Sequence, residues 1–444
     1  MSTAVTAALD IRGELDALPL NARHWLLVVV LAFVTLFDGY DVFAPAYVIP
    51  YAIQEWSLQP AQAGLLVSSG LIGFMIGALA NGPIADRIGR KPTLLAGLLL
   101  AATLSLCTAI WARSFGIFLV MRLLTGLGLG VLLPLSVTLV NETAPRSATN
   151  LLMGCMMVGW SAGGVLAALV GAALAPLYGW PSLFWVAGAS LPLVVICTAV
   201  LRESPRFLVT HRRHEEALVV MAWLAPRRAS EYRDLTFGLC DDTARQGSLR
   251  RLLEPDLRRG TIVVWLCAGC SLFTIYGLSG WVPQAMLQNG ESFRASFGFG
   301  ALLQTMAILG GVVCGIAADR VSRRGVLMTT WLLGAAAVTG LALTNRHWTH
   351  VAFVAVAGFC VMGAQPVLNN FTAALYSTEI RSTGVGAELG VGRLGGILGP
   401  YAGGWLQQIF PGTLALYLSM ATALILSTLC LAALRRKVPH TGAG

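Results

Sequence analysis

Long runs of apolar residues alternate with short polar segments along almost the whole chain. Each run approaches the roughly 20 helical residues that cross a hydrocarbon core of about 30 Å. The pattern therefore predicts transmembrane helices rather than strands or surface helices. The twelve expected spans are residues 25–50, 61–80, 92–111, 117–140, 148–174, 182–201, 260–282, 296–317, 326–344, 351–374, 383–408 and 412–434.

A polar stretch at residues 202–259 separates six spans from the next six, and it holds twelve of the 30 Lys and Arg residues. We expect it to be a linker on the cytoplasmic side. The expected organisation is a six-helix half at 25–201, this linker, and a second six-helix half at 260–434, with short polar ends at 1–24 and 435–444.

The composition agrees with this class and excludes others. Hydrophobic residues make up 56% of the 444 residues and charged residues 11%, whereas soluble domains carry about 25% charge. The net charge of +9 does not indicate nucleic-acid binding, because the basic residues lie in short loops rather than on one solvated face. Residues 1–23 are charged and have no apolar core before Trp25, so no cleaved signal is expected.

The basic residues also predict an orientation. If the amino terminus is cytoplasmic, 25 of them lie in cytoplasmic segments and three, Arg113, Arg294 and Arg346, lie outside. The positive-inside rule therefore predicts that both termini are cytoplasmic.

Metal, redox and histidine chemistry are not expected. Eight of the nine cysteines fall inside apolar spans, where they act as small apolar residues. Cys267 and Cys270 have CxxC spacing but lack the soluble context of a redox motif. None of the six histidines lies in the middle of a span, so histidine is an unsuitable proton carrier here, and no cofactor or metal is predicted.

The two halves repeat one another. The loop Gly82-Pro-Ile-Ala-Asp-Arg-Ile-Gly-Arg-Lys91 follows the second span, and Gly315-Ile-Ala-Ala-Asp-Arg-Val-Ser-Arg-Arg324 follows the eighth, 233 residues later. Duplicated transporter halves place their substrate site at the interface near the membrane midplane. Charge pairs in these loops and at the ends of spans four and ten are expected to lock and release the halves. The expected cytoplasmic gate residues are Asp86, Arg87, Arg90, Asp319, Arg320, Glu142, Arg146, Glu379 and Arg381.

These loops, the run Arg122-Leu-Leu-Thr-Gly-Leu-Gly-Leu-Gly130 and the segment Arg202-Glu-Ser-Pro-Arg206 resemble the major facilitator superfamily over nearly the whole chain. Asp38-Gly-Tyr-Asp41, with the glycine-rich stretch from Gly384 to Pro400, resembles its aromatic acid:proton symporters. The resemblance implies an all-α fold of twelve helices in two pseudo-symmetric halves, a bacterial inner-membrane location, and a functional monomer that carries an aromatic carboxylate with protons.

Charged groups inside the spans call for a function, because each costs about 2.5–3.5 kcal/mol at a helix centre. Asp38 and Asp41 lie one helical turn apart in span one and are expected to face the bundle. Two like charges so close favour proton uptake by one of them. Glu388 is the third acid, and the five residues to Arg393 turn the two side chains about 140° apart. We expect proton coupling at Asp38, Asp41 and Glu388; the alternative is permanent structural pairing with arginine.

Arg122 and Arg393 are the fixed cations, one in each half. A guanidinium binds a carboxylate with two parallel hydrogen bonds, which suits an anionic substrate. The three acids and two arginines sum to −1, so one proton makes the set neutral. The resemblance assigns Arg393 to substrate or coupling, whereas structural pairing remains open for both arginines.

Aromatic and amide side chains at similar depth complete the candidate site. Tyr40, between the two aspartates, is expected to stack on a benzoate-like ring. Phe37, Phe43, Trp160 and Trp281 are more typical of packing. The remaining candidate substrate-binding residues are Tyr276, Gln304, Gln365 and Asn369.

The favoured function is proton-coupled import of a hydroxybenzoate-like acid. Import of another small organic anion and proton-driven efflux of drugs or organic ions remain alternatives, although two membrane arginines disfavour a cationic drug. An intramembrane aspartyl protease needs its acids on facing helices, whereas Asp38 and Asp41 share one. A transport-inactive sensor of the same fold also remains open.

Overall fold

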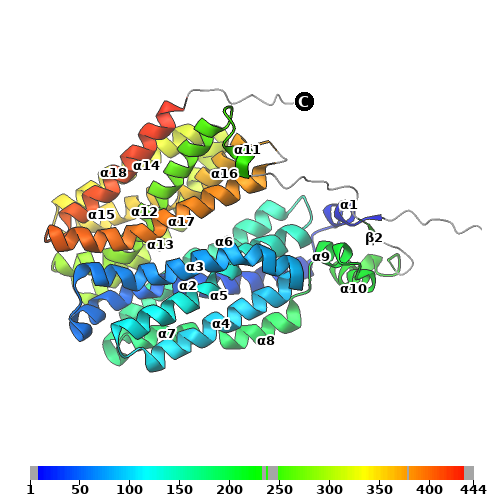
Figure 1. Ribbon diagram of the computed structural model, residues 1–444, viewed down its shortest axis with the longest axis horizontal. Coiled ribbons are helices and arrows are strands. Elements are labelled where there is room, and N and C mark those ends of the chain that lie inside the picture. The colour runs from blue at the N-terminus through cyan, green and yellow to red at the C-terminus, as the bar shows by residue number, and fades with distance from the viewer. Residues whose placement is uncertain (1–8, 233–236, 239–248, 378–379, 435–444) are drawn as a thin grey trace, which may run out of the picture.

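The computed structural model describes residues 9–232, 237–238, 249–377 and 380–434. Nearly all of them are helical (Figure 1). The first helix group comprises α2 (Ala22–Trp56), α3 (Pro60–Ile88), α4 (Arg90–Trp111), α5 (Phe115–Thr143), α6 (Thr149–Tyr178), α7 (Pro181–Gly188) and α8 (Leu191–Val200). The second helix group comprises α12 (Arg258–Gln288), α13 (Phe293–Arg320), α14 (Arg323–Leu343), α15 (His347–Ala357), the π-helical turn η2 (Gly358–Met362), α16 (Gln365–Leu375), α17 (Arg381–Ile409) and α18 (Leu414–Ala433).

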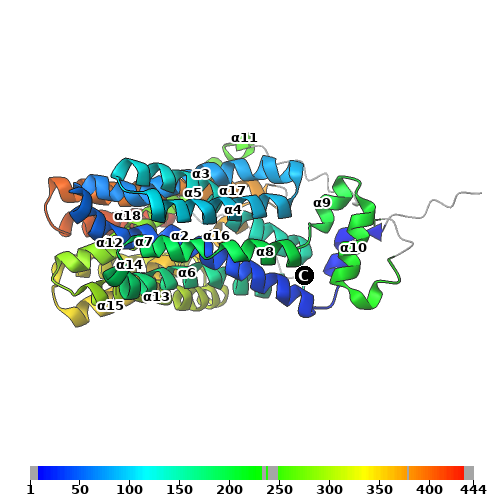
Figure 2. The ribbon, with the colours of Figure 1, turned by 90° about the horizontal axis from the view of Figure 1, so that it is seen from below.

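Short elements gather at one end of this bundle, which we call the linker end (Figure 2). They are β1 (Leu9–Asp10), α1 (Ile11–Asp16), α9 (Pro205–Thr210), α10 (His214–Leu224), the 3₁₀ turn η1 (Pro226–Arg228) and β2 (Phe237–Gly238). The short helix α11 (Leu249–Leu252) lies apart from them and contacts α17. The strands β1 and β2 pair in parallel, with Leu9 opposite Phe237. The amide of Asn21 donates to the carbonyl of Leu224 at 2.7 Å, so α10 is attached to the start of α2.

Eleven helical segments of the described chain are long and apolar enough to cross a membrane, with α7–α8 and α15–α16 each counted as one. The long helix α17 is not among them, because it carries charged residues and many glycines. It nevertheless packs lengthwise against α12 and α3, inside the bundle. The all-helical membrane fold class is confirmed.

Glycines allow the helices of each group to pack closely. A Cβ at Gly73 or Gly77 in α3 would collide with the backbone of α5, and a Cβ at Gly126 would collide with the backbone of α3. In the second group, a Cβ at Gly395 in α17 would collide with the backbone of Gly269 in α12. Small residues have this role in membrane bundles, where backbone approach replaces the hydrophobic effect as the source of packing.

The helix pairs that join the two groups most extensively are α3 with α17, α6 with α13, and α2 with α12. Near the end opposite the linker, Tyr47 of α2 contacts Phe297 of α13, with ring centres 5.1 Å apart, and Tyr51 contacts Phe293 at 5.5 Å. Further along, the hydroxyl of Ser68 in α3 donates to the carbonyl of Ile397 in α17 at 2.7 Å. In Figure 1, α3 and α17 approach one another at that opposite end and diverge toward the linker end.

Candidate functional site

Arg393 of α17 lies where the two groups meet. Its guanidinium carbon is 4.0 Å from the centre of the Phe74 ring in α3. One of its nitrogens donates to the hydroxyl of Tyr276 in α12, at 3.4 Å. Arg393 is half-buried rather than enclosed. A guanidinium held this loosely, by one long hydrogen bond and a ring face, retains donors for a carboxylate.

Four aromatic rings surround this position, and we call them the aromatic cage: Phe43, Phe74, Trp160 and Tyr276. Phe43 of α2 stacks with Tyr276, with ring centres 6.4 Å apart and an interplanar angle of 24°. Trp160 of α6 meets both Phe43 and Phe74 edge-on, at 6.1 Å in each case. The cage therefore combines three helices of the first group with α12 of the second, and it presents apolar ring faces beside one cation.

Asp38 of α2 is fully buried, and neither carboxylate oxygen has a hydrogen-bond partner. The charges that act on it most are those of Arg393, from the other group, and of Asp41. Burying an unpaired carboxylate costs several kcal/mol. This free-energy cost can be removed either by protonation of Asp38 or by closer approach of a cation to its carboxylate.

Asp41 has a different environment from Asp38, although both are buried as expected. Its Oδ1 pairs with a nitrogen of Arg122 at 2.6 Å, and its Oδ2 accepts from the hydroxyl of Ser105. A second nitrogen of Arg122 donates to the backbone carbonyl of Asp41 at 2.8 Å. This is the permanent pairing with arginine that the sequence leaves open as the alternative to proton coupling. The carboxylate of Asp41 thus has all its partners within the first group, whereas the charge of Arg393, in the second group, acts on Asp38.

Arg122 does not reach the cage. Beyond its pair with Asp41, its guanidinium carbon lies 5.2 Å from the centre of the Phe184 ring in α7, within the first group. Its partner on α2, Asp41, lies on the face toward α4 and α5. The expected contact of Arg122 with substrate stays a prediction, and in this structure Arg122 instead makes the structural pair that was its alternative.

Tyr40, like Arg122, lies within the first group in this structure, and its expected stacking on a substrate ring stays a prediction. Its side chain is fully buried, and its hydroxyl donates to the carbonyl of Leu183 in α7 at 2.8 Å. This contact turns the ring into the first group and away from Arg393. Residues two apart on a helix do not face the same way, so the proximity of Tyr40 to Asp38 in sequence did not place it beside Asp38 in space.

Glu388 lies on the part of α17 that faces its own group. It is fully buried and both carboxylate oxygens lack hydrogen-bond partners. Its charge acts on Cys267 of α12 and on Tyr376, and it forms neither a hydrogen bond nor an ion pair with Arg393 in the described chain. The five-residue separation from Arg393 thus leads to two different environments on one helix, as the helical geometry predicts.

The amide side chains divide between two places. Gln304 of α13 is buried with its Oε1 unpartnered. A Cβ built at Gly164 would lie 2.7 Å from its Nε2 and 2.9 Å from the ring of Phe43, so Gln304 lies beside the cage. Gln365 of α16 instead accepts from the hydroxyl of Ser271 at 2.9 Å and donates to Asn369 at 3.1 Å. This polar chain stays within the second group and directly follows the π-helical turn η2.

The candidate gate is organised around Arg90, at the linker end of the first group. Arg90 pairs with Asp86 at 3.1 Å and with Glu142 at 3.4 Å. Glu203 accepts hydrogen bonds from the backbone N–H of Arg90, at 2.9 Å, and of Lys91. Glu203 is not among the residues expected from the sequence, because its place in a Ser-Pro-containing linker motif gives no sign that it caps the start of α4. Arg87, Arg146, Asp319, Arg320 and Arg381 are exposed, and Glu379 lies outside the described residues.

The comparisons with known proteins agree with this architecture. The profile of the Major Facilitator Superfamily matches residues 31–313 and 264–444. The chain is 35% identical to the gallate transporter of Pseudomonas putida, over 90% of this chain and 89% of that one. It is 33% identical to the 4-hydroxybenzoate transporter PcaK of Pseudomonas aeruginosa, over 98% of both. It is 31% identical to the benzoate transport protein of Acinetobacter baylyi, over 90% of this chain and 87% of that one.

Solved structures show the same fold at low identity. A bacterial homolog of the human lysosomal transporter Spinster, in an inward-facing conformation, superposes with a TM-score of 0.72 at 19% identity, covering 93% of this chain and 96% of that one. The xylose transporter XylE from E. coli, in a partially occluded inward-open conformation, gives 0.71 at 16% identity, covering 92% and 97%.

Proposed function

Because the chain belongs to the major facilitator superfamily, a family of transporters and not of enzymes, we propose that it imports an aromatic carboxylate together with protons. The observation that carries this proposal is Arg393 beside Phe74, together with the unpartnered Asp38 of the other group, on which the charge of Arg393 acts. The relatives named for gallate, 4-hydroxybenzoate and benzoate support the same substrate class.

In this proposal the aromatic cage takes the ring of the substrate and Arg393 takes its carboxylate. The substrate exchanges the cation–π contact with Phe74, worth about 0.5–2 kcal/mol, for a charge-assisted pair that is at least as strong. Gln304 lies beside Phe43 with a free carbonyl oxygen, which suits a hydroxyl donor on the ring.

Proton coupling follows from competition for one guanidinium. With Asp38 ionised, its charge and that of Arg393 cancel, just as the Asp41 and Arg122 charges cancel each other. When a substrate carboxylate binds Arg393, Asp38 becomes an uncompensated buried anion unless it takes up a proton. Substrate and proton therefore stabilise each other's binding. Glu388 is a second buried acid available for protonation, and Asp41 positions Arg122.

Alternating access requires the two halves, 25–201 and 260–434, to rock around this site. We place the linker end, with both chain termini, on the cytoplasmic side of a bacterial inner membrane, because the basic residues concentrate there. The contacts of Tyr47 and Tyr51 with α13 then close the periplasmic end. The ion pairs of Arg90 belong to the cytoplasmic gate. The monomer contains the complete site.

Uptake of labelled gallate, 4-hydroxybenzoate and benzoate by cells expressing the chain tests the proposal. We expect accumulation above the external concentration that a protonophore abolishes, and no accumulation by the variant Arg393→Gln. Competition by unlabelled aromatic acids, but not by aliphatic acids, would separate this substrate class from other organic anions. Lower retention of the acids or of a cationic dye in expressing cells would instead indicate efflux and contradict the proposal.

A further inference from the structure

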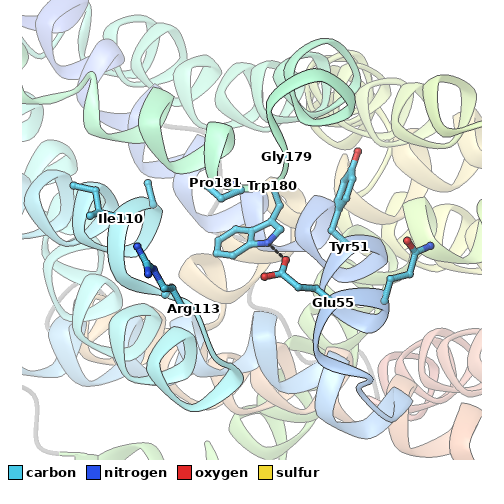
Figure 3. A pocket seen from close by; sticks show the side chains of 10 residues that line it. Tyr51, Glu55, Ile110, Arg113, Gly179, Trp180 and Pro181 are labelled. Atoms are coloured by element: carbon cyan, nitrogen blue, oxygen red, sulfur yellow. Dashed lines mark hydrogen bonds between the residues drawn. The ribbon is translucent and has the colours of Figure 1, made fainter.

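A cavity of about 560 Å³ opens at the end of the first group opposite the linker (Figure 3). Its walls come from the last turn of α2, the end of α4, the turn between α4 and α5, and the turn between α6 and α7. It lies within one group, at the ends of its helices, and is therefore separate from the aromatic cage that both groups form. Its polar walls include Tyr51, Glu55, Arg113 and Trp180.

Trp180 gives this cavity a rigid aromatic wall. Its indole N–H donates to Oε2 of Glu55 at 2.7 Å. Its ring packs edge-on against Trp56, Phe118 and Phe184, with ring centres 5.6–6.0 Å apart. An indole fixed on this many sides loses little further freedom when a ligand binds, which lowers the entropic cost of binding.

Arg113 supplies a cation that the protein does not use. It is exposed in the turn between α4 and α5, where its backbone N–H donates to the carbonyl of Trp111 at 2.8 Å, and within the described chain its guanidinium has neither a hydrogen-bond nor an ion-pair partner. In Figure 3 its guanidinium and the Glu55 carboxylate lie to either side of the Trp180 ring. Tyr51 also lines the cavity, and Figure 3 shows its hydroxyl pointing away from Trp180 and Glu55. The cavity thus offers a free cation, a flat ring, and a carboxylate with an unused oxygen.

We propose that this cavity is an external binding site for a hydroxylated aromatic carboxylate, which occupies it before entering the aromatic cage. The carboxylate of the ligand pairs with Arg113, its ring packs on Trp180, and its hydroxyl donates to Glu55. The inference rests on the proposed function, because it takes the transported acid as the ligand and the opposite end as the outer face.

The site has a direct connection to the closed end of the bundle. Tyr51 lines the cavity and also contacts Phe293 and Phe297 of α13, with ring centres at 5.5 and 6.4 Å. A ligand in the cavity therefore touches Tyr51. The contact of Tyr51 with α13 must open before a substrate can reach the aromatic cage from outside.

Equilibrium dialysis of the purified full-length protein with labelled 4-hydroxybenzoate counts the sites. We expect two molecules per chain for the wild type, one for Arg113→Gln and one for Arg393→Gln. Arg294→Gln, a matched control that removes an exposed arginine at the same end outside the cavity, keeps two. In uptake assays, Arg113→Gln should raise KM about tenfold and leave kcat unchanged, as expected when one charge-assisted contact is lost before the transport step.

The outcomes separate this inference from the proposed function. A single site that disappears in Arg393→Gln and persists in Arg113→Gln overturns the external site and leaves the transporter proposal intact. Two sites that both survive Arg113→Gln also overturn it. If the wild type binds no aromatic acid, both proposals fail. As a further check, benzoate, which lacks the hydroxyl, should bind Arg393→Gln about tenfold more weakly than 4-hydroxybenzoate does.

Discussion

The guanidinium of Arg393, on α17 of the second helix group, lies 4.0 Å from the ring centre of Phe74, on α3 of the first. A cation–π contact of this kind is worth about 0.5–2 kcal/mol, much less than the loss of a buried ion pair. Arg393 thus connects the two groups without being fixed by either. Arg122, by contrast, makes two hydrogen bonds to Asp41, one to the carboxylate and one to the backbone carbonyl, and stays within one group.

Replacing Arg393 by lysine keeps the charge but removes the planar pair of donors. We expect kcat/KM for aromatic acid uptake to fall about 10- to 100-fold, because a hydrogen bond to a charged group contributes about 1.5–3 kcal/mol. Initial rates in proteoliposomes measure this. Arg346→Gln, at an exposed site away from the cage, should behave as wild type. Unchanged kinetics for the lysine variant would mean that Arg393 does not hold the carboxylate.

Asp38→Asn imitates a permanently protonated acid. We expect the variant to bind substrate and to exchange labelled for unlabelled substrate, but to lose accumulation driven by a proton gradient. Counterflow and gradient-driven uptake in the same proteoliposomes separate these two activities. Asp256→Asn, in an exposed part of the linker, should retain both. Gradient-driven accumulation at the wild-type level by Asp38→Asn would remove this residue from the coupling scheme.

Asp41 should behave differently from Asp38, because it is paired. Asp41→Asn leaves Arg122 as an uncompensated buried cation, and breaking such a pair costs about 3–5 kcal/mol. We expect a marked fall in the thermal unfolding temperature of the detergent-purified variant. The double variant Asp41→Asn with Arg122→Met removes the orphaned charge and should recover much of the loss. A single variant as stable as wild type would show that the pair contributes no stability.

Because the pKa of Glu291 is lowered, we expect the protein to lose stability in acid through this carboxylate, at the end opposite the linker. Burial raises its pKa, but hydrogen bonds from His347, at 2.9 Å, and from His350, at 3.3 Å, together with their charges outweigh burial, so the pKa is lowered from 4.5. A carboxyl group with a lowered pKa in the folded protein contributes stability above its unfolded value and loses it as the pH falls through the folded value.

Thermal unfolding of the purified protein between about pH 6 and pH 3 tests this linkage. The unfolding temperature of the wild type should fall more steeply below about pH 4.5 than that of Glu291→Gln, which has no carboxylate to titrate. Glu215→Gln, an exposed acid at the linker end, serves as the control and should follow the wild-type curve. Parallel curves for wild type and Glu291→Gln would contradict the prediction.

The sequence predicted the fold and the family well, because both rest on features that extend along the whole chain. Apolar runs of membrane-crossing length and the repeated Asp-Arg loops do not depend on any single contact, and the family is confirmed. Only α17 departs from the hydropathy pattern. Its glycines and its two buried or half-buried charges lower its hydropathy for the same reason that they make it a candidate site helix.

The site was predicted less well, because it depends on the direction in which each side chain points. Arg393 and Tyr276 lie together as expected, but Tyr40 faces α7. Phe74 was missed, since one phenylalanine in an apolar span looks the same whether it faces lipid, its own group or the opposite group. Asp38 and Asp41 are equivalent in sequence, and only the packing of α4 and α5 against one of them distinguishes their environments.

Glu203 attaches the linker, which is the covalent connection between the halves, to the first group. By capping the start of α4 it fastens the beginning of the linker to the first group, and Asn21 fastens α10 to α2 in the same way. The chain as far as α10 thus belongs physically with the first six spans. Two separate polypeptides, divided between α10 and α11 and produced in the same cell, should therefore reassemble into an active carrier, whereas a cut immediately after α8 should not.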